Sequence, residues 1–267
     1  MMGEREVAMT PQKVPWLLAF ALLLGWQGIL AGDVLIVSDQ HPQMEVLAHH
    51  LRTRSNLAAA IVEQPRLPAA LSGYQCVFVF IHGALQEPVE LQLIEYARSG
   101  GRLILLHHSI SQAKGKNRYW FPFLGMTLRP GDLEQGGYQW IHGVSFSVVN
   151  LAPGHYITTH NVKYDAEIDY RGEAPGGLRG RFPAFLLKGS EIFLNHRFTD
   201  GAEKTVLLGF KYRHEPSGAT YMQDRAAWYK PAGKGWIMYF LPGHTTDDLG
   251  NEAYAQILLN AVSAKLP

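Results

Sequence analysis

The sequence of 267 residues has one cysteine, Cys76, and almost no net charge. A single cysteine excludes an intrachain disulfide, and no cysteine comes directly after the N-terminal apolar stretch to carry a lipid. Cys76 opens the apolar run CVFVFI, where we expect a buried, unreactive thiol. Lys and Arg number 24 against 23 Asp and Glu, so the formal charge is +1. Because no run of basic residues exists either, we expect no nucleic-acid partner.

Several motifs and segment types are also missing. The chain has no GxGxxG and no P-loop, which argues against a dinucleotide or nucleoside triphosphate cofactor. It shows no internal repeat, low-complexity tract or interdomain linker. Its length and its 47% content of hydrophobic residues suit one large core. We therefore expect residues 32–267 to form a single domain.

The N-terminus is almost wholly apolar over residues 14–31 (VPWLLAFALLLGWQGILA), directly after Lys13. A short apolar region that ends in small residues is typical of a secretory signal, which we place at residues 1–31. The alternative is an uncleaved membrane anchor, since the stretch is near the lower limit for spanning a bilayer. Pro15, Gly25 and Gln27 favour cleavage. The sequence therefore predicts an exported protein, periplasmic or secreted, that contacts the membrane only through this segment.

Apolar runs alternate with helical patterns over the first part of the domain. Runs bounded by polar residues predict buried strands at 33–39, 58–62, 76–81, 102–106 and 235–240. Apolar residues at helical spacing predict three helices, one after the first strand, one before the fourth strand and one at the end of the chain. Asn251 can cap the last of them. This order predicts βαβ units with a parallel sheet. Between residues 123 and 220 short strand-like runs alternate with turns, as in an insertion or an antiparallel extension.

Histidines gather at the ends of the predicted strands. His41 follows the first strand, His82 the third, His107 and His108 the fourth, and His244 the last. In an open α/β sheet, ligands bind outside the carboxyl ends of the strands. An imidazole there can transfer a proton or ligate a metal, although for any single histidine a packing role stays open. The pattern predicts a histidine-lined crevice.

Two other constellations have less specific patterns. Ser109 follows the histidine pair on a strand-to-helix turn, but no flanking glycines permit a strained nucleophile elbow. A helix cap is therefore expected there, with a serine peptidase kept as a remote alternative. Asp165, Glu167 and Asp169 alternate in YDAEIDY, so that they share one face of a strand. They form either a solvated face or a carboxylate cluster near the crevice.

Four segments resemble motifs of the trehalose-utilisation family, the ThuA-like proteins. They are SGGRLILLHHS, GHYIT, EIFLNHRFTDGAEKTVLL and AGKGWIMYFLPGHTTDDLGNEAYAQILLNAV. Through them the resemblance assigns family site positions to His107, His155, Glu191 and His244. The sequence departs from the family pattern at Tyr156, Ser190, Phe193 and Pro242.

The resemblance also implies a fold. The family is similar to class I glutamine amidotransferases, whose fold is a flavodoxin-like three-layer sandwich with a mainly parallel sheet. We expect the irregular region to form an antiparallel insertion in the C-terminal half. Those enzymes keep a nucleophilic cysteine where this chain has His107, and Cys76 belongs to a different strand. Since thiolate chemistry needs an exposed and activated sulfur, glutaminase activity is not expected.

The leading hypothesis from the resemblance is an enzyme of carbohydrate utilisation that acts on a disaccharide, glycoside or keto-sugar. In this hypothesis, one cluster of side chains acts as general acid and base or binds a zinc-like divalent metal. Without a metal, a histidine and the glutamate could abstract a proton beside a carbonyl. The expected catalytic or metal-ligating residues are His107, His155, Glu191 and His244. The expected substrate-binding residues are His41, His82, Trp120 and His142.

The second hypothesis is a non-catalytic carbohydrate-binding or accessory protein on the same scaffold. A group of aromatic side chains could stack on sugar rings or simply pack an irregular region. A binder would titrate with sugar yet release no product. The oligomeric state is left open. The aromatic residues concerned are Tyr119, Trp120, Phe121, Phe123, Tyr138 and Trp140.

Overall fold

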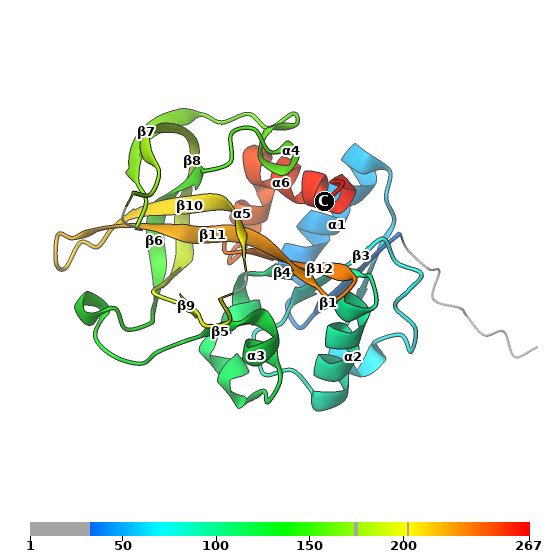
Figure 1. Ribbon diagram of the computed structural model, residues 1–267. Helices are drawn as coiled ribbons and strands as arrows, with labels where there is room; N and C mark the ends of the chain where they lie inside the picture. Colours follow the sequence, from blue (N-terminus) through cyan, green and yellow to red (C-terminus); the bar gives the residue numbers. More distant parts are fainter. Residues whose placement is uncertain (1–32, 174–175, 202) are drawn as a thin grey trace, which may run out of the picture.

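The computed structural model describes residues 33–173, 176–201 and 203–267 (Figure 1). The predicted signal at residues 1–31 lies outside the described residues. Across the described part of the chain, no helix combines the length and the apolar character that crossing a membrane requires.

A ten-stranded sheet organises the described residues, in the order β2-β1-β3-β4-β12-β11-β10-β6-β8-β7. Its first half is parallel and its second half antiparallel. The parallel strands are β1 (Val34–Ser38), β2 (Ala59–Val62), β3 (Cys76–Phe80), β4 (Arg102–Leu106) and β12 (Gly235–Phe240). The antiparallel strands are β6 (Gln139–Asn150), β7 (Ala166–Arg171), β8 (Arg179–Leu194), β10 (Thr205–Arg213) and β11 (Thr220–Ala232). A separate pair consists of β5 (Met126–Thr127) and β9 (Arg197–Phe198).

The parallel half follows from its apolar runs. Every residue of β1 and β3 is buried, as expected of strands covered on both faces. When these five strands are numbered by their order in the chain, their order across the sheet is 2-1-3-4-5, which is the flavodoxin-like order. The structure is therefore consistent with the expected flavodoxin-like core.

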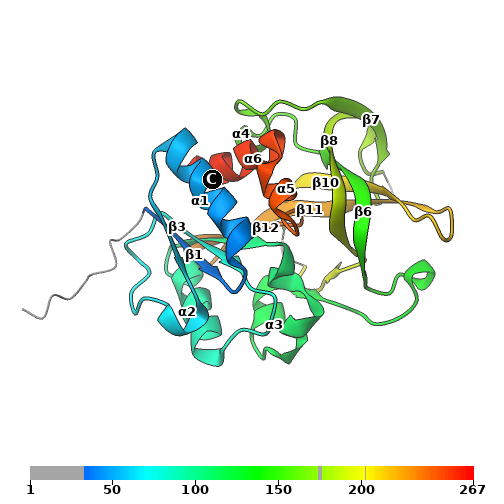
Figure 2. The ribbon, with the colours of Figure 1, turned by 180° about the vertical axis from the view of Figure 1, so that it is seen from behind.

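Helices flank the parallel strands. In Figures 1 and 2, α1 and α6 lie on one side of these strands and α2 lies on the other. Asn251 caps α6 as expected, accepting from the Tyr254 backbone N–H at 3.1 Å. The α-helices are α1 (His41–Ser55), α2 (Glu87–Arg98), α3 (Trp120–Leu124), α4 (Tyr156–Thr159), α5 (Thr246–Gly250) and α6 (Glu252–Ser263). Short 3₁₀ turns are η1 (Gln64–Arg66), η2 (His107–Ile110), η3 (Gln112–Lys116) and η4 (Leu133–Gln135).

The antiparallel half is larger than the sequence predicted. Its strands continue the same sheet from β12 and include β8 with 16 residues and β11 with 13. A sheet that is mainly parallel was expected, and this is corrected, because five of the nine strand pairings in the sheet are antiparallel. Long antiparallel strands with one partly exposed face lack the continuous apolar runs that marked the parallel ones.

Cys76 is buried at the amino end of β3. Burial raises the pKa of its thiol to about 12, so almost no thiolate forms at neutral pH. We expect the native protein to show no reaction with Ellman's reagent at pH 8, and to release one thiol per chain in denaturant. Rapid labelling of the native protein would contradict the burial of this strand.

His196 is fully buried after β8, and neither ring nitrogen has a hydrogen-bond partner within the described part of the chain. Burial holds its pKa well below the usual value, and Arg225 acts in the same direction. The unfolded chain therefore binds a proton that the folded chain does not, so stability falls as pH drops below about 6.5. When the pH falls from 7 to 5.5, the unfolding free energy of the wild type is expected to drop, and that of His196→Phe to drop by about 1 kcal/mol less. Urea titrations at both pH values measure this, and equal losses would contradict it.

Candidate functional site

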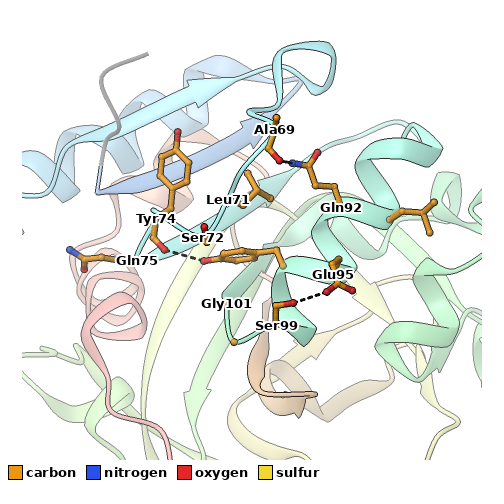
Figure 3. Close-up of a pocket in the computed structure, with 12 residues that line it drawn as sticks. Ala69, Leu71, Ser72, Tyr74, Gln75, Gln92, Glu95, Ser99 and Gly101 are labelled. Atoms are coloured by element: carbon orange, nitrogen blue, oxygen red, sulfur yellow. Dashed lines mark hydrogen bonds between the residues drawn. The ribbon is translucent and has the colours of Figure 1, made fainter. Parts of the chain in front are cut away.

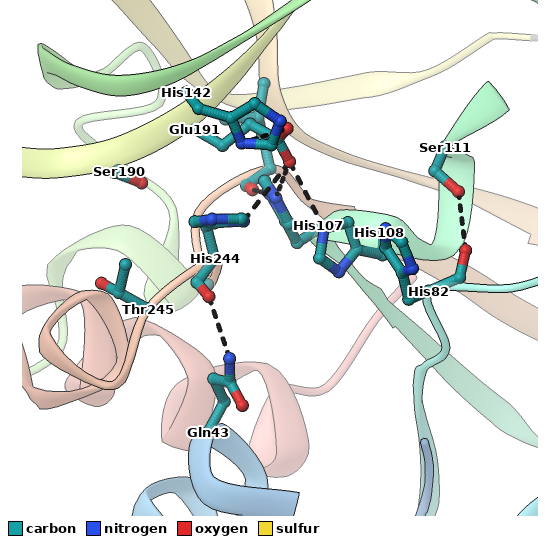
Figure 4. A network of polar contacts seen from close by, with 12 residues as sticks. Gln43, His82, His107, His108, Ser111, His142, Ser190, Glu191, His244 and Thr245 are labelled. Carbon is teal, nitrogen blue, oxygen red and sulfur yellow. Dashed lines mark hydrogen bonds and ion pairs between the residues drawn. The ribbon is translucent and has the colours of Figure 1, made fainter. Parts of the chain in front are cut away.

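A cluster of three histidines and one glutamate lies at the carboxyl ends of β4 and β12 (Figure 4). His107 and His108 begin η2 directly after β4, and His244 follows β12. Glu191 comes from β8, in the antiparallel half. One potential ligand atom from each of the four side chains lies within 4.8 Å of the others. The strand-end rule thus brings the histidines together, and the antiparallel half supplies the carboxylate.

Glu191 is the centre of this cluster. Its Oε2 atom lies 2.7 Å from His107 Nε2, 3.3 Å from His108 Nε2 and 3.4 Å from His244 Nδ1. Its Oε1 atom lies 2.9 Å from Nδ1 of His142, an exposed residue of β6. One carboxylate oxygen therefore faces three imidazole nitrogens.

Burial and charge set the protonation of the cluster. Burial alone would raise the pKa of Glu191, but its hydrogen bonds to the histidines outweigh burial and hold that pKa far below its usual range. Burial lowers the pKa of His108 to about 3, against the opposing effect of Glu191. For His244 the interaction with Glu191 raises the pKa and outweighs burial. At neutral pH the cluster therefore holds a carboxylate anion and a neutral His108.

His107 is oriented from both sides. Its Nδ1 lies 2.6 Å from the Leu241 carbonyl oxygen, which can only accept, so Nδ1 carries a proton and Nε2 points at Glu191. The ring stacks on Phe193 with centroids 4.5 Å apart. Its backbone has φ of 38°, in the left-handed region that residues with a Cβ rarely adopt. Such local strain is concentrated at functional sites.

The loop that carries His244 is held by the carboxylate of Asp248. This buried oxygen accepts from Ser190 Oγ at 2.6 Å and from the His244 backbone N–H at 2.9 Å. It also accepts from the backbone N–H groups of Gly243 and Thr245, at 3.2 and 3.4 Å. Because Ser190 precedes Glu191, one side chain links the two halves of the cluster.

Asp248→Ala is expected to destabilise the fold by about 3 kcal/mol, since it leaves several buried donors without an acceptor. It should also weaken any ligand binding that needs His244 in place. Chemical denaturation measures the first effect. The matched control is Asp247→Ala, an exposed acid of the same helical turn that should change stability by at most about 0.5 kcal/mol. Equal effects of both substitutions would contradict this role of Asp248.

A buried lysine supports the turns beneath the cluster. Lys114 is completely buried, and its ammonium donates to the carbonyl oxygens of Ile81 and Gly83, both at 2.6 Å, and of His108 at 3.1 Å. An ammonium has three N–H donors, and all three have partners here. Lys114 therefore fixes the segments after β3 and β4, which carry His82 and His108.

An open cavity of about 330 Å³ adjoins the cluster. Glu191 and Phe193 of β8 share one face of the sheet with Trp140 and His142 of the paired strand β6. Trp140 is 47% exposed, so its indole is accessible from the cavity. Besides these four, the lining residues are His82, His108, Ser111, Gln112 and Ala113.

The structure brings most of the predicted site residues together. His107, Glu191 and His244 meet in the cluster, and His142 contacts Glu191. His82 lines the cavity, with its ring edge-on to that of His108 at a centroid distance of 4.6 Å.

Three expected residues lie elsewhere, which corrects the sequence interpretation. His155 caps α4: its Nδ1 accepts from the Ile157 N–H, and its Nε2 lies 3.2 Å from Tyr229 Oη. Both ring nitrogens are therefore engaged away from the cluster. His41 begins α1, is not among the residues that line the cavity beside the cluster, and lies 3.8 Å from a carboxylate oxygen of Glu63. Trp120 is fully buried and donates to the Ser109 carbonyl, so it packs the core and cannot touch a substrate.

Sequence reasoning missed two members of the site. His108 was placed at a strand end but was not assigned to the cluster, since only His107 matches a family motif. Adjacent residues of a strand point to opposite faces, but on the tight turn η2 both imidazoles reach Glu191. Lys114 gave no signal, because a lysine in a polar segment is normally exposed.

A larger cavity of about 620 Å³ lies at the other end of the parallel strands, between α2 and the segment before β3 (Figure 3). Tyr96 Oη donates to the Tyr74 carbonyl across it, at 3.3 Å. Among the described residues that line it, the one carboxylate is Glu95, which accepts from Ser99 Oγ at 2.6 Å. Because no group of titratable side chains from the described part of the chain converges there, the histidine cluster is the candidate site.

Solved structures share this fold. A ThuA-like protein from Bacteroides uniformis has 14% identity and a TM-score of 0.57, with 85% of this chain and 88% of that chain covered. A ThuA-like protein from Parabacteroides merdae has 16% identity and a TM-score of 0.57, with 88% of this chain and 92% of that chain covered. A cytoplasmic protein from Salmonella typhimurium has 14% identity and a TM-score of 0.52, with 86% of this chain and 98% of that chain covered. No family model and no curated protein sequence matches the chain. The ThuA-like resemblance is thus shown at the level of the fold.

Proposed function

We propose that this protein is a metal-dependent enzyme of carbohydrate utilisation, with a divalent ion of the zinc type held by His107, His108, Glu191 and His244. The observation that carries the proposal is the convergence of three imidazoles on one buried carboxylate beside an open cavity. A solely structural polar network has no need of an accessible cavity. Strongly perturbed titratable groups in a cleft are typical of active sites.

The donor set fits such an ion. Zinc bonds to nitrogen and oxygen are about 2.0–2.2 Å long, so the four atoms, which lie within 4.8 Å of one another, would have to draw slightly closer to bind one ion. Neutral imidazole is the ligand form of histidine, and the lowered pKa of His108 keeps it neutral. His107 directs Nε2 to the cluster while its Nδ1–H donates to a backbone carbonyl, the usual outer partner of a metal-bound histidine. His244 Nδ1 is buried and has no well-aligned hydrogen bond in the described part of the chain, so it is available to bind a metal ion.

When bound, the ion would polarise a substrate carbonyl or lower the pKa of a water molecule. The chain's own residues do the rest. His142 and His82, on the cavity side of the cluster, can donate to or accept from sugar hydroxyl groups. His142 already lies against Glu191 Oε1 and can hold a proton at its Nδ1 there. Phe193 excludes water from one side of His107 by stacking on its ring.

The carbohydrate part of the proposal rests on the motif resemblance and on the fold shared with ThuA-like proteins. The exposed indole of Trp140 beside the cluster supports it, since an aromatic face packs against the C–H face of a sugar ring. The same indole would serve a non-catalytic sugar-binding protein, which is the second candidate. Export through the N-terminal segment is part of the proposal and is tested by N-terminal sequencing of the mature protein.

Zinc analysis followed by turnover assays tests the function. The purified protein is expected to bind one zinc per chain and to release product from a disaccharide, a glycoside or a keto-glycoside. Loss of turnover after chelation, with recovery on zinc addition, would support the enzyme. Sugar binding without product would support the second candidate instead. A protein that binds neither zinc nor sugar would contradict both.

A further inference from the structure

The larger of the two cavities described above lies at the amino ends of the parallel strands. Gly101, which lines it, comes directly before β4, and His107 comes directly after that strand. At about 3.3 Å per residue, roughly 20 Å of strand separate these two positions. The cavity is therefore separate from the histidine cluster, and its volume of about 620 Å³ suits a small molecule.

We propose that this cavity is a second ligand site, which binds a small organic ammonium ion with an apolar body. It is independent of zinc binding, because no residue of the histidine cluster lines this cavity. Three features of the cavity support such a ligand. They are a carboxylate without an ion pair, an apolar and aromatic lining, and walls that are held together by hydrogen bonds.

The charge of the cavity favours a cation. Among the described residues that line it, Glu95 carries the only charge. Glu95 lies in the last turn of α2, where the helix dipole adds further negative charge. Arg98 of the same turn places its guanidinium 5.7 Å from the centre of the Phe123 ring, and no basic side chain in the described part of the chain forms an ion pair with Glu95. An ammonium group of a ligand would supply the missing partner.

The rest of the lining suits an apolar body on that ligand. Tyr74 and Tyr96 both line the cavity, and burial raises the pKa of Tyr96 to about 12, so its ring stays a neutral phenol. The face of such a ring attracts a cation. Leu91 is 45% exposed and adds aliphatic surface. An inorganic cation would leave this apolar surface in contact with water, whereas an organic ammonium ion would cover it.

The walls of the cavity are already ordered (Figure 3). Gln92 Nε2 of α2 donates to the Pro68 carbonyl at 2.6 Å and to the Ala69 carbonyl at 3.2 Å. The Tyr96 ring lies so close to Gly101 that a Cβ at that position would collide with it. Because α2 is thus fixed to the segment before β3, a ligand can bind between them without first having to order either wall.

An NMR titration of the ¹⁵N-labelled protein at pH 7 tests the inference. The probes are phenethylammonium, the neutral 2-phenylethanol and the anionic phenylacetate, which share an aromatic ring and differ in charge. Phenethylammonium is expected to bind at least about tenfold more tightly than 2-phenylethanol. The largest shifts are expected at the backbone amides of Gln92, Glu95 and Ser99. Phenylacetate is expected to cause no saturable shifts at these amides.

Three variants assign the binding to this cavity. Glu95→Gln keeps the shape of the side chain and removes its charge, so the preference for phenethylammonium should fall to within about twofold. Glu87→Gln neutralises an exposed acid in the first turn of the same helix and is the matched control, which should keep the preference. Ser72→Trp, which fills the cavity, should abolish the binding of both probes. Since all three positions are exposed, each variant should fold as the wild type does.

The inference is overturned if phenethylammonium causes no saturable shifts up to about 10 mM, or if 2-phenylethanol binds as tightly. It is also overturned if Glu95→Gln keeps the preference, or if the shifts occur at His107, His108 and His244 instead. The titration needs neither zinc nor turnover. Its failure would therefore leave the proposed enzyme standing, and loss of the zinc assignment would leave this second site standing.

Discussion

Replacing His108 or His244 with alanine is expected to weaken zinc binding by more than about 100-fold. Loss of a residue that only orients a ligand already costs roughly 10- to 100-fold in metal affinity, and loss of a ligand should cost at least as much. Each substitution removes one of the four donor atoms that lie within 4.8 Å of one another. Competition titration with a chromophoric chelator measures the affinity, and metal analysis after dialysis measures the stoichiometry.

His155→Ala is the matched control for these variants. It makes the same chemical change at a histidine that the family motif assigned to the site and that the structure places at the cap of α4. Zinc affinity is expected to stay within about twofold of the wild type, given that its ring lies outside the cluster. If the His108 and His244 variants both retain full zinc affinity, the ligand assignment is wrong.

Lys114→Met is expected to lower the free energy of unfolding by about 3 kcal/mol. The substitution keeps an apolar stem of similar length but leaves three buried carbonyl oxygens without their donor. A hydrogen bond from a charged group contributes roughly 1.5–3 kcal/mol, and part of this is offset because the charge no longer has to be buried. Thermal unfolding should shift down by about 6–12 °C for a chain of this size.

Lys116→Met gives the comparison for this variant. Lys116 ends the same 3₁₀ turn η3 but is exposed, so its replacement should change stability by no more than about 0.5 kcal/mol. Because Lys114 also holds the segments of His82 and His108, we expect weaker zinc binding in Lys114→Met than in Lys116→Met. Equal stability of the two variants would show that the three carbonyl contacts do not support the fold.

The parallel half of the sheet was predictable because its signals are local. Strands such as β1 and β3 are short, wholly buried and bounded by polar residues, so the apolar run alone marks them. Asn251 marks the start of α6 by the side-chain oxygen that caps it. The place of the histidines then follows from a general rule on where parallel strands end.

The antiparallel half could not be predicted in the same way. The strand β8 begins with exposed residues, and its register against β6 is irregular between Ile141 and Phe146. Pairing of this kind depends on contacts between residues that are distant in the sequence. That Glu191 belongs with the histidines was therefore available from family resemblance alone.

Two errors at the site have a common physical cause. The sequence placed His155 by its motif and Trp120 by its aromatic character, but neither pattern reports which way a side chain points. The indole N–H of Trp120 donates to the Ser109 carbonyl inside the core, and the two ring nitrogens of His155 are engaged by the Ile157 N–H of α4 and by Tyr229 of β11. A polar group that finds a partner within the fold is no longer available to a substrate.

The most direct test of the account is an anomalous diffraction measurement on crystals of the zinc-loaded protein. At the zinc edge we predict one strong peak among His107 Nε2, His108 Nε2, His244 Nδ1 and a carboxylate oxygen of Glu191, at about 2.0–2.2 Å from its ligands. An empty cluster at saturating zinc, with Glu191 still hydrogen-bonded to His107, would contradict the account.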